Sequence, residues 1–249
     1  GRLPARPVIV TFDDGFEDYY RLAFPILREC AVPATFFLAT GYIGKKGTFW
    51  FDEVAYLVGK AECGKLRLGS VNLTVELDAT RDSRKQGVRL LLRRFKEVPN
   101  VQRLAGLEEL RRGVAAAREV ATRPESRTMT WGQVREMAAN GMEFGSHTVT
   151  HPILSRVDRD GVYLELRDSM EAIEQVLGSK VRVLSYPVGG TAGFSPMVQE
   201  VAQEAGYELA VSYISGTNRL GAIDRFAMRR IHVERYIDRA GFTAMLAAP

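Results

Sequence analysis

The sequence predicts an α/β fold built from repeated strand–helix units. Several short apolar runs are each followed by residues with helical spacing, which is typical of parallel strands connected by helices. This rhythm breaks once, between Gly41 and Met129, and then resumes. The chain has 249 residues, of which 46% are apolar and 26% are charged. Such a composition fits a globular protein with a large core and excludes a disordered chain.

The predicted strands are short, and the first of them, at residues 7–12, is almost wholly apolar, as expected of a parallel strand covered on both faces. They comprise residues 7–12, 34–39, 142–145, 181–186, 207–212 and 228–233. The predicted helices cover residues 19–27, 130–140, 159–177, 195–205 and 239–247. Thr130 and Gln133 form a capping-box pattern, and Gly141 and Gly178 are expected to end helices. The elements therefore alternate along the chain as parallel βα folds require.

Residues 41–129 are predicted to be an inserted segment within a single domain that covers residues 1–249. Residues 66–77 alternate apolar and polar side chains on either side of Gly69-Ser70, which indicates a β-hairpin. Residues 84–120 have helical spacing and are basic. The insertion is therefore expected to be mostly helical with one hairpin.

The positive charge of the chain belongs to the inserted segment. The formal net charge is +4, but residues 81–127 alone carry 13 basic and six acidic side chains, a net +7. The rest of the chain is therefore net acidic, at −3. Interspersed acids favour a solvated helix face over a surface for an anionic partner, and no nucleic-acid-binding motif is present, so no nucleic-acid partner is expected.

The two cysteines and the chain start give few constraints. Cys30 and Cys63 fit no metal-binding spacing and are expected to be small buried thiols, although whether they pair is left open. No window approaches 18 consecutive apolar residues, so no transmembrane segment is expected. The sequence starts at Gly1 without a charged and then apolar leader.

Two adjacent carboxylates follow the first predicted strand, in Thr11-Phe12-Asp13-Asp14-Gly15. Catalytic groups in parallel βα proteins lie at the carboxyl ends of strands, because the loops there meet on one face. Adjacent side chains at a strand end point in different directions, so one carboxylate can bind a metal while the other faces a water molecule. A turn or a helix cap is the structural alternative for this triplet.

Two of the three histidines in the chain follow the strand predicted at residues 142–145. His147 and His151 lie four residues apart in the segment SHTVTHP, residues 146–152. This spacing places both imidazoles on one side of a single turn, where they can supply two ligands to one ion. With Asp14 they predict a metal site that keeps coordination positions open, as catalytic metal sites do.

These two segments resemble the first two motifs of the polysaccharide deacetylases, the NodB-homology or carbohydrate esterase family four enzymes. The resemblance runs over most of the chain, through residues 184–190 and 228–233, and leaves out only the insertion. It implies a distorted, incomplete (β/α) barrel of the NodB-homology type, with a mostly helical insertion that contains a β-hairpin. It also implies metal-dependent removal of N-acetyl groups from a hexosamine-containing polysaccharide, with release of acetate.

The resemblance assigns roles to residues of the first three motifs. Asp13 matches the catalytic base, and Asp14, His147 and His151 match the ligands of one divalent transition metal ion. Zinc is the expected ion, with cobalt, nickel or manganese as alternatives. Val188 matches the residue whose backbone N–H stabilises the oxyanion.

The third motif departs from its better-known version. Ser185 stands where the family commonly has an arginine that pairs with the catalytic aspartate. Arg230, alone or with the neighbouring Arg229, resembles the arginine of the YP-x-G branch of the family and is expected to replace that partner. Tyr186 and Pro187 are expected to line the substrate groove.

Two further residues are candidates for the site. His232 matches the late histidine that the family uses as a general acid, although the Leu-x-x-His form of that motif is missing and a core or rim role stays open. Trp50, between Phe49 and Phe51, is expected to stack on a sugar ring or else to anchor the insertion. The tryptophan motif that the family has after the third motif is absent.

Several functional questions stay open at this point. An O-acetyl ester would pass through the same intermediate as an N-acetyl group, and a small cyclic amide is a further alternative substrate. A catalytically silent glycan-binding protein is a third possibility. Because members of the family mostly act on exported or cell-wall polymers, an exported, periplasmic or cell-surface location is expected. The oligomeric state is left open.

Overall fold

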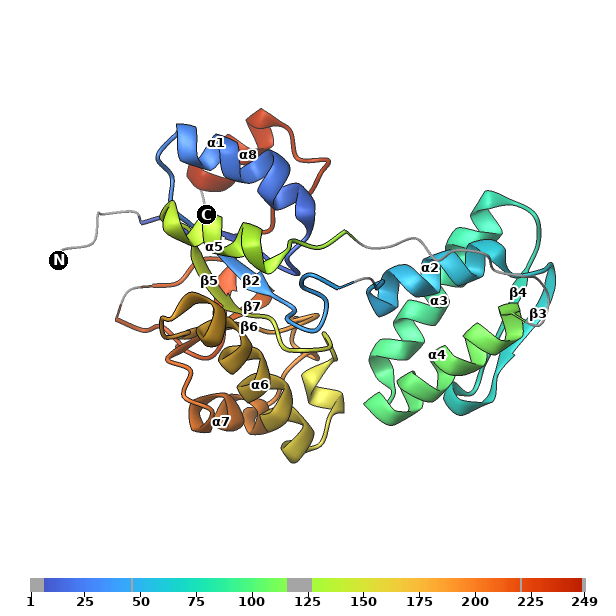
Figure 1. Ribbon diagram of the computed structural model, residues 1–249. Coiled ribbons are helices and arrows are strands. Elements are labelled where there is room, and N and C mark those ends of the chain that lie inside the picture. The colour runs from blue at the N-terminus through green and yellow to red at the C-terminus, as the bar shows by residue number, and fades with distance from the viewer. Residues whose placement is uncertain (1–6, 46, 116–126, 220, 248–249) are drawn as a thin grey trace. The chain divides into compact units, whose positions relative to one another are not determined.

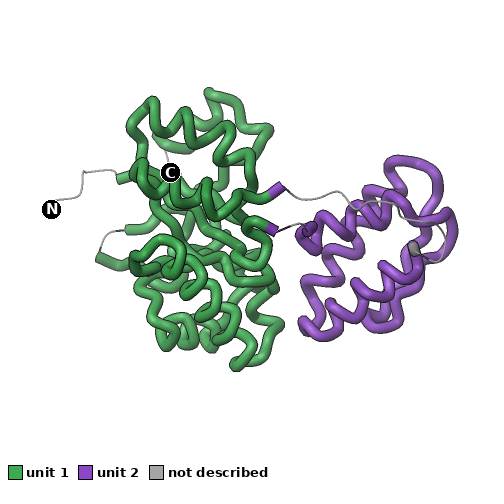
Figure 2. The backbone as a smooth tube through the Cα atoms, in the orientation of Figure 1, with its two compact units in different colours: residues 1–44, 128–249 green, residues 45–127 purple. Residues whose placement is uncertain are grey.

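The chain forms two compact units. The computed structural model describes residues 7–45, 47–115, 127–219 and 221–247 (Figure 1). One unit comprises residues 1–44 and 128–249, and the other comprises residues 45–127 (Figure 2). The sequence predicts that residues 41–129 are an insertion within a single domain. Residues 45–127 of this segment form a compact unit by themselves.

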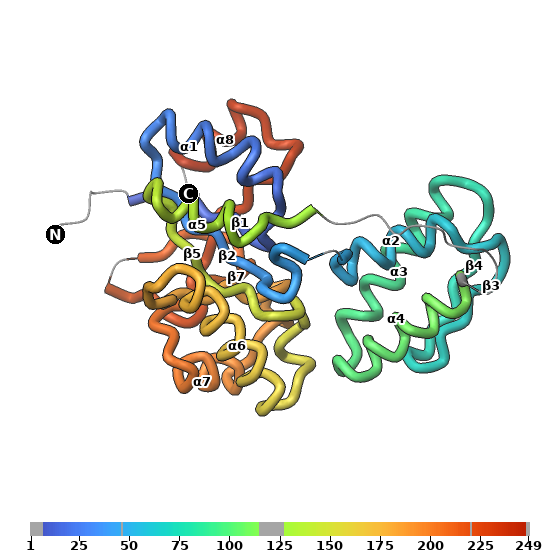
Figure 3. Tube along the Cα trace, viewed as in Figure 1, coloured from blue at the N-terminus to red at the C-terminus, as the bar shows by residue number. Residues whose placement is uncertain are grey.

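The first unit is built on a sheet of six parallel strands in the order β1-β2-β5-β6-β7-β8 (Figure 3). The strands are β1 (Val10–Phe12), β2 (Ala34–Leu38), β5 (Glu143–Ser146), β6 (Val183–Ser185), β7 (Leu209–Ser215) and β8 (Met228–Arg230). Every pairing between neighbours is parallel. Within the described residues β8 does not pair with β1, so the curled sheet is an incomplete barrel. This confirms the predicted fold class.

The first and last strands are shorter than the sequence predicts. Val8 and Ile9 precede β1 and are 67% and 72% exposed, so the apolar run at residues 7–12 continues beyond the paired strand. The last strand ends at Arg230 rather than at Val233, which places His232 in the segment that follows the strand. Apolar composition therefore overestimates strand length at both edges of the sheet, where only one neighbour is present.

The helices of the first unit lie where the helical spacing predicts them, with one irregularity. They are α1 (Phe24–Glu29), α5 (Trp131–Ala139), α6 (Arg159–Leu177), α7 (Pro196–Glu204) and α8 (Arg239–Ala247), with a 3₁₀ turn at Leu154–Arg156. A π-helical segment, Tyr19–Ala23, directly precedes α1. The capping box of Thr130 and Gln133 is present, and Gly178 ends α6 in the left-handed conformation. None of the helices described here is both long enough and apolar enough to cross a membrane.

The core of the first unit lies between the sheet and its helices. Phe36 and Leu38 on β2 are fully buried, and Phe12 stacks on Phe36 with ring centroids 4.7 Å apart. Met137 on α5 and Leu166 on α6 are also fully buried in the same cluster. This packing fixes the ends of the strands from which the polar loops emerge.

The described part of the second unit, residues 45, 47–115 and 127, contains three helices and a two-stranded hairpin. Its elements are α2 (Trp50–Lys60), β3 (Gly64–Leu68), a 3₁₀ turn (Gly69–Val71), β4 (Leu73–Leu77), α3 (Arg81–Glu97) and α4 (Asn100–Ala115). The antiparallel pairing of β3 with β4 confirms the predicted hairpin. Helix α2 has no counterpart among the predicted elements. The predicted helical stretch at residues 84–120 divides into α3 and α4, and its last residues, from 116, lie outside the described part of the chain.

Several arginines of the basic segment are structural. The Arg84 Nη1 donates to the carbonyl oxygens of Val58 and Ala61 at 2.7 and 2.6 Å, which caps the end of α2. Arg94 Nε donates to Val71 O at 2.6 Å. Some of the basic side chains of residues 81–127 therefore serve as hydrogen-bond donors to backbone carbonyls inside the unit.

The cysteines differ from their predicted state. Cys30 and Cys63 are both free and exposed, whereas small buried thiols were expected. Cys30 follows the end of α1, and Cys63 lies between α2 and β3. Both positions are short connections at the ends of helices, where little of the surrounding chain covers the side chain.

Candidate active site

Three potential metal ligands meet at the carboxyl ends of β1 and β5. Asp14 Oδ1 lies 3.5 Å from His147 Nε2 and 3.2 Å from His151 Nε2. The ligand atoms of these residues all lie within 4.8 Å of one another. The structure thus brings together the three residues that the sequence predicts as a metal site.

The backbone around Asp14 is shaped so that the side chain points into this cluster. Asp14 has a φ of 72°, and Gly15 follows with a φ of 89°. A Cβ atom on Gly15 would lie 2.7 Å from Ile43 Cδ1, so a larger residue would meet both strain and a clash. The Asp-Asp-Gly triplet therefore forms a tight turn, and the same turn directs the Asp14 carboxylate toward the two histidines.

The donor set fits a divalent cation. His147 Nδ1 lies 2.7 Å from Ser185 O, and since a carbonyl oxygen only accepts, Nδ1 carries the proton and Nε2 presents a lone pair. Burial lowers the pKa of His147, which keeps the ring neutral. Asp14 Oδ1 is buried and accepts no hydrogen bond from the described residues. Electron-pair donors that converge in this way need a positive ion.

Asp13 points to the other side of the turn and pairs with Arg230 at the end of β8. Arg230 Nη1 donates to Asp13 Oδ1 at 2.8 Å, and Nη2 donates to Oδ2 at 2.7 Å. Ser185 Oγ donates to Asp13 Oδ2 at 3.2 Å. Arg230 Nε donates to Ser212 O at 2.9 Å, which fixes the guanidinium plane. The arginine predicted to replace the third-motif arginine thus forms a bidentate pair with the candidate base.

This environment keeps the Asp13 carboxylate ionised. Burial by itself raises the pKa of Asp13, but the hydrogen bonds and charge of Arg230, together with the hydrogen bond from Ser185, lower it more strongly. The net pKa lies below the ordinary value for an aspartate. An ionised carboxylate next to a metal site can accept a proton from water.

Val188 and Tyr186, both in the third motif, lie in different surroundings. Val188 has a φ of 51°, which is rare for a β-branched residue, and in the described residues its N–H donates to no protein acceptor. Tyr186 is 1% exposed, stacks on Phe194, and donates its hydroxyl to Phe226 O at 2.9 Å. The expectation that its side chain lines the groove is corrected, because the ring and hydroxyl belong to the core. Pro187 is buried as well.

His232 lies beside an exposed aromatic ring. Tyr213 stacks on His232 with ring centroids 3.5 Å apart and donates its hydroxyl to Glu234 at 2.8 Å. Burial, and then the charge of Arg230, lower the pKa of His232. His232 Nε2 is buried and unpartnered within the described residues. The segment after β8 thus places an imidazole within electrostatic range of Arg230 and Asp13.

Trp50 belongs to the core of the second unit. It is 3% exposed, its ring centroid lies 6.5 Å from that of Phe95, and the Arg103 guanidinium lies 4.9 Å from its centroid. A ring covered in this way has no face for a sugar. The substrate-binding role expected for Trp50 is therefore corrected to a packing role, which was its structural alternative.

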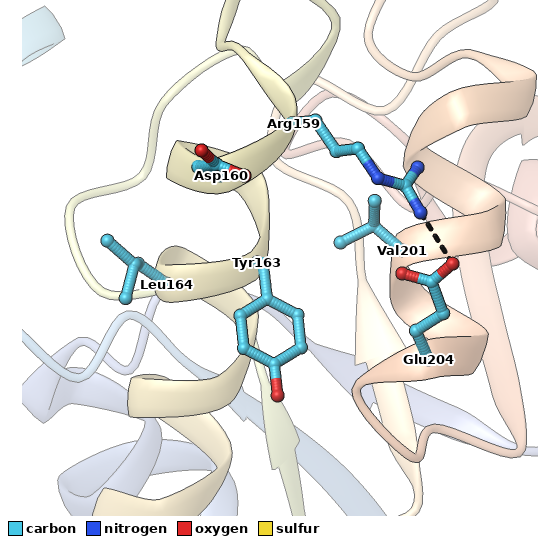
Figure 4. A pocket seen from close by; sticks show the side chains of 6 residues that line it. All are labelled: Arg159, Asp160, Tyr163, Leu164, Val201 and Glu204. Atoms are coloured by element: carbon cyan, nitrogen blue, oxygen red, sulfur yellow. Dashed lines mark hydrogen bonds and ion pairs between the residues drawn. The ribbon is translucent and has the colours of Figure 1, made fainter.

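A surface pocket lies outside the predicted site. It has a volume of about 280 Å³ and lies between α6 and α7, lined by Arg159, Asp160, Tyr163, Leu164, Val201 and Glu204 (Figure 4). In Figure 4 the Arg159 side chain reaches across to Glu204, with which it forms an ion pair. None of the predicted site residues lines this pocket, so it is no candidate for the metal-dependent chemistry.

Comparison with known proteins identifies the family. The sequence profile of the family described as polysaccharide deacetylase matches residues 1–210. The chain belongs to the polysaccharide deacetylase family. The YxkH protein of Bacillus subtilis (strain 168) is 21% identical over 243 residues, which cover 96% of this chain and 56% of that protein. The chain thus spans about half the length of this curated relative.

A shorter match connects this deacetylase-family chain to a relative with a stated substrate. A poly-β-1,6-N-acetyl-D-glucosamine N-deacetylase of Staphylococcus aureus (strain MSSA476) is 38% identical over 55 residues, which cover 22% of this chain and 19% of that protein. The match is confined to a fifth of each chain.

Solved structures of other proteins share the fold of this chain. The Streptococcus pyogenes deacetylase PplD, in complex with acetate, superposes with a TM-score of 0.61 at 20% identity, covering 98% of this chain and 73% of that chain. IcaB from Ammonifex degensii superposes with a TM-score of 0.59 at 19% identity, covering all of this chain and 76% of that one. The incomplete barrel is thus the polysaccharide deacetylase fold.

Three residues of the site were not identified as such from the sequence. Ser185 was seen only as a missing arginine, yet its hydroxyl bonds to Asp13 and its carbonyl orients His147. Tyr213 has no predicted role, yet its ring stacks on His232. Glu165 lies within a predicted helix, and its carboxylate bonds to the loop that carries the histidines. Ser185 belongs to the third motif, but neither Tyr213 nor Glu165 stands in a motif.

Proposed function

We propose that this protein is a metal-dependent hydrolase that removes N-acetyl groups from a hexosamine-containing polysaccharide and releases acetate. The observation that carries the proposal is the convergence of Asp14, His147 and His151 beside the Asp13–Arg230 pair. A polymer of β-1,6-linked N-acetylglucosamine is the first substrate to test, because a relative with that named activity matches part of the chain.

Asp14, His147 and His151 would hold the ion, with zinc as the expected metal. When bound, such an ion acts as a Lewis acid on the acyl carbonyl and makes water acidic enough to react near neutral pH. Asp13 accepts the proton from the attacking water while Arg230 keeps its carboxylate ionised and oriented.

The remaining steps fall to the third motif and to His232. The Val188 N–H donates to the oxyanion of the tetrahedral intermediate, an interaction for which one donor is worth about 3 to 4 kcal/mol. His232 supplies a proton to the departing amine. We further propose an exported or cell-surface location, because the polysaccharides on which the family acts are mostly exported or part of the cell wall.

The alternative substrates use the same groups. An O-acetyl ester has a carbonyl that the site would attack in the same way, but its alkoxide leaving group needs less help from a general acid than an amine does. We favour an N-acetyl substrate because the imidazole of His232, near the Asp13–Arg230 pair, could protonate an amine leaving group. A silent glycan-binding protein would have no need for three converging donors.

The decisive experiment measures acetate release from N-acetylglucosamine oligomers. The purified protein is assayed as prepared, after removal of metal with a chelator, and after addition of zinc or cobalt. We expect activity to disappear with the chelator and to return with the metal. If no N-acetylated or O-acetylated glycan tested releases acetate in a metal-dependent way, the enzymatic proposal is refuted.

A further inference from the structure

The loop that supplies two of the three metal ligands has an unfavourable backbone. Thr148 has a φ of 68° and His151 has a φ of 54°, so two non-glycine residues within the loop at residues 147–151 adopt the left-handed conformation. Such residues persist only where the surroundings hold them. The contacts that hold this loop therefore decide the spacing of the two imidazoles.

Three of the five N–H groups of the loop are satisfied by the sheet or by the loop itself. The His147 N–H donates to Leu38 O at 2.9 Å. The Thr148 N–H donates to Ser146 Oγ at 3.2 Å, and the His151 N–H donates to Thr148 Oγ1 at 3.0 Å. These bonds fix the two ends of the loop and leave its middle to be held by another group.

The two N–H groups in the middle of the loop donate to one carboxylate on a neighbouring helix. Both the Val149 and Thr150 N–H groups lie 2.8 Å from Glu165 Oε2. The Thr150 hydroxyl donates to Glu165 Oε1 at 2.5 Å. Glu165 lies on α6 and is half-buried; the bond from the Val149 N–H is partly buried, whereas the two bonds from Thr150 are exposed. All three bonds are charge-assisted.

The same peptide unit is held from its other side. The Val149 carbonyl accepts from the Gly41 N–H at 2.9 Å, while the N–H of that peptide, on Thr150, donates to Glu165. A Cβ atom at Gly41 would lie 2.5 Å from Val149 O, so the segment after β2 approaches the loop as closely as glycine permits. The Val149–Thr150 peptide is thus clamped between the segment after β2 and α6.

We propose that Glu165 is a positioning residue of the metal site. Its carboxylate fixes the Val149–Thr150 peptide and thereby holds His147 and His151 at the separation that the ion needs. Glu165 is not one of the three candidate ligand residues, so it acts through the loop. The inference rests on the metal site of the proposed function, and it assigns a role to a residue outside the four motif residues.

The test compares zinc affinity among variants at Glu165. Zinc affinity is measured by competition with a chromophoric chelator, the absorption spectrum of the cobalt-loaded protein reports ligand geometry, and thermal unfolding reports stability. Glu165→Ala is expected to weaken zinc binding about tenfold, in the range found when groups that orient metal ligands are removed, and to change the cobalt spectrum. Glu171→Ala, on the same helix and exposed, is the matched control and is expected to leave both unchanged.

A conservative variant separates positioning from a purely structural role. In Glu165→Gln the amide oxygen can accept from both N–H groups, and the amide nitrogen can donate to the Thr150 hydroxyl. We therefore expect Glu165→Gln to keep zinc affinity within about threefold of the original protein, with an unchanged cobalt spectrum. An equal loss in the glutamine and alanine variants would overturn the hydrogen-bonding role.

The outcomes distinguish this inference from the proposed function. If the original protein binds neither zinc nor cobalt, the proposed metal site itself fails. If the original protein binds zinc and a folded Glu165→Ala binds it equally well with the same cobalt spectrum, Glu165 has no positioning role. Should Glu165→Ala not fold, Glu165→Asp decides, because it keeps the charge but withdraws the carboxylate by one methylene. Unchanged affinity in that variant would overturn the inference, and weaker affinity would support it.

Discussion

Two bidentate carboxylate–arginine pairs with the same donor–acceptor distances occur in the two units, one through both terminal nitrogens of the arginine and the other through Nε and Nη2. In the first unit Arg230 donates to both oxygens of Asp13 at 2.8 and 2.7 Å. In the second unit Arg111 donates to both oxygens of Glu53 at 2.8 and 2.7 Å. The Glu53 side chain is only 4% exposed, against 23% for Asp13. Pair geometry and burial by themselves therefore do not distinguish a catalytic carboxylate from a structural one.

The neighbours of each carboxylate make the distinction. Asp13 lies at a strand end beside Asp14 and His147, in a turn with left-handed backbone. Glu53 lies in the first turn of α2 and connects that helix to α4 through Arg111. A charged pair between two helices contributes to stability, whereas one at converging strand ends can serve chemistry.

The largest effect on activity is expected at Asp13, the candidate base. Asp13→Asn keeps the size of the side chain and removes the base, so we expect kcat for deacetylation to fall about 10²- to 10⁴-fold, the range for general-base removal. Zinc affinity should stay within a few fold. Asp18→Asn, the same substitution at an exposed nearby position, is the control and should retain full activity. A fully active Asp13→Asn would remove the distinction between the two pairs.

A smaller effect is expected at His232. His232→Ala should lower kcat for N-acetyl substrates about 100-fold, a typical contribution of a general acid, because an amine leaves poorly without a proton. Activity on an acetyl ester with a good leaving group, such as a nitrophenyl ester, should change much less. Steady-state kinetics on both substrates measures the difference. A loss below tenfold on the amide would assign the proton to another donor.

Arg230 tests the pairing itself. Because Arg230 lowers the pKa of Asp13, its removal raises that pKa, and the acid limb of the kcat/KM profile should move to higher pH. We expect Arg230→Ala to reduce kcat/KM about tenfold on the acid limb of the profile, where the ionised fraction of Asp13 limits the rate, and by less at the original optimum. Arg229→Ala is the matched control, since Arg229 donates to Ser215 O rather than to Asp13. An unmoved profile in Arg230→Ala would contradict the role.

The smallest functional effect is expected at the structural pair. Glu53→Gln removes the charge opposite Arg111 and should destabilise the second unit by about 2 kcal/mol, the scale of hydrogen bonds to charged groups. Thermal or denaturant unfolding measures this loss. The zinc affinity of the first unit should be unchanged. Arg112→Ala, at a residue whose side chain is 72% exposed, is the control for stability. A tenfold loss of zinc affinity in folded Glu53→Gln would place Glu53 in the site.

Sequence patterns predicted most elements of the first unit because those patterns are local. The capping box at Thr130 and Gln133 and the glycine end of α6 each depend on residues within one turn of a helix. The strand edges at Val8 and beyond Arg230 were predicted less well, because pairing with a neighbour, rather than apolar composition, decides where a strand ends.

The sequence by itself determined the family and the four motif residues Asp13, Asp14, His147 and His151. Each pair of these residues lies within one short segment, and the carboxyl ends of parallel strands necessarily meet on one side of the sheet. Only the tertiary structure decided that Glu165 and Ser185 hold the loop and the carboxylate, and that Trp50 is buried. These roles depend on contacts between distant segments, and a sequence specifies such contacts only through the packing of the whole fold.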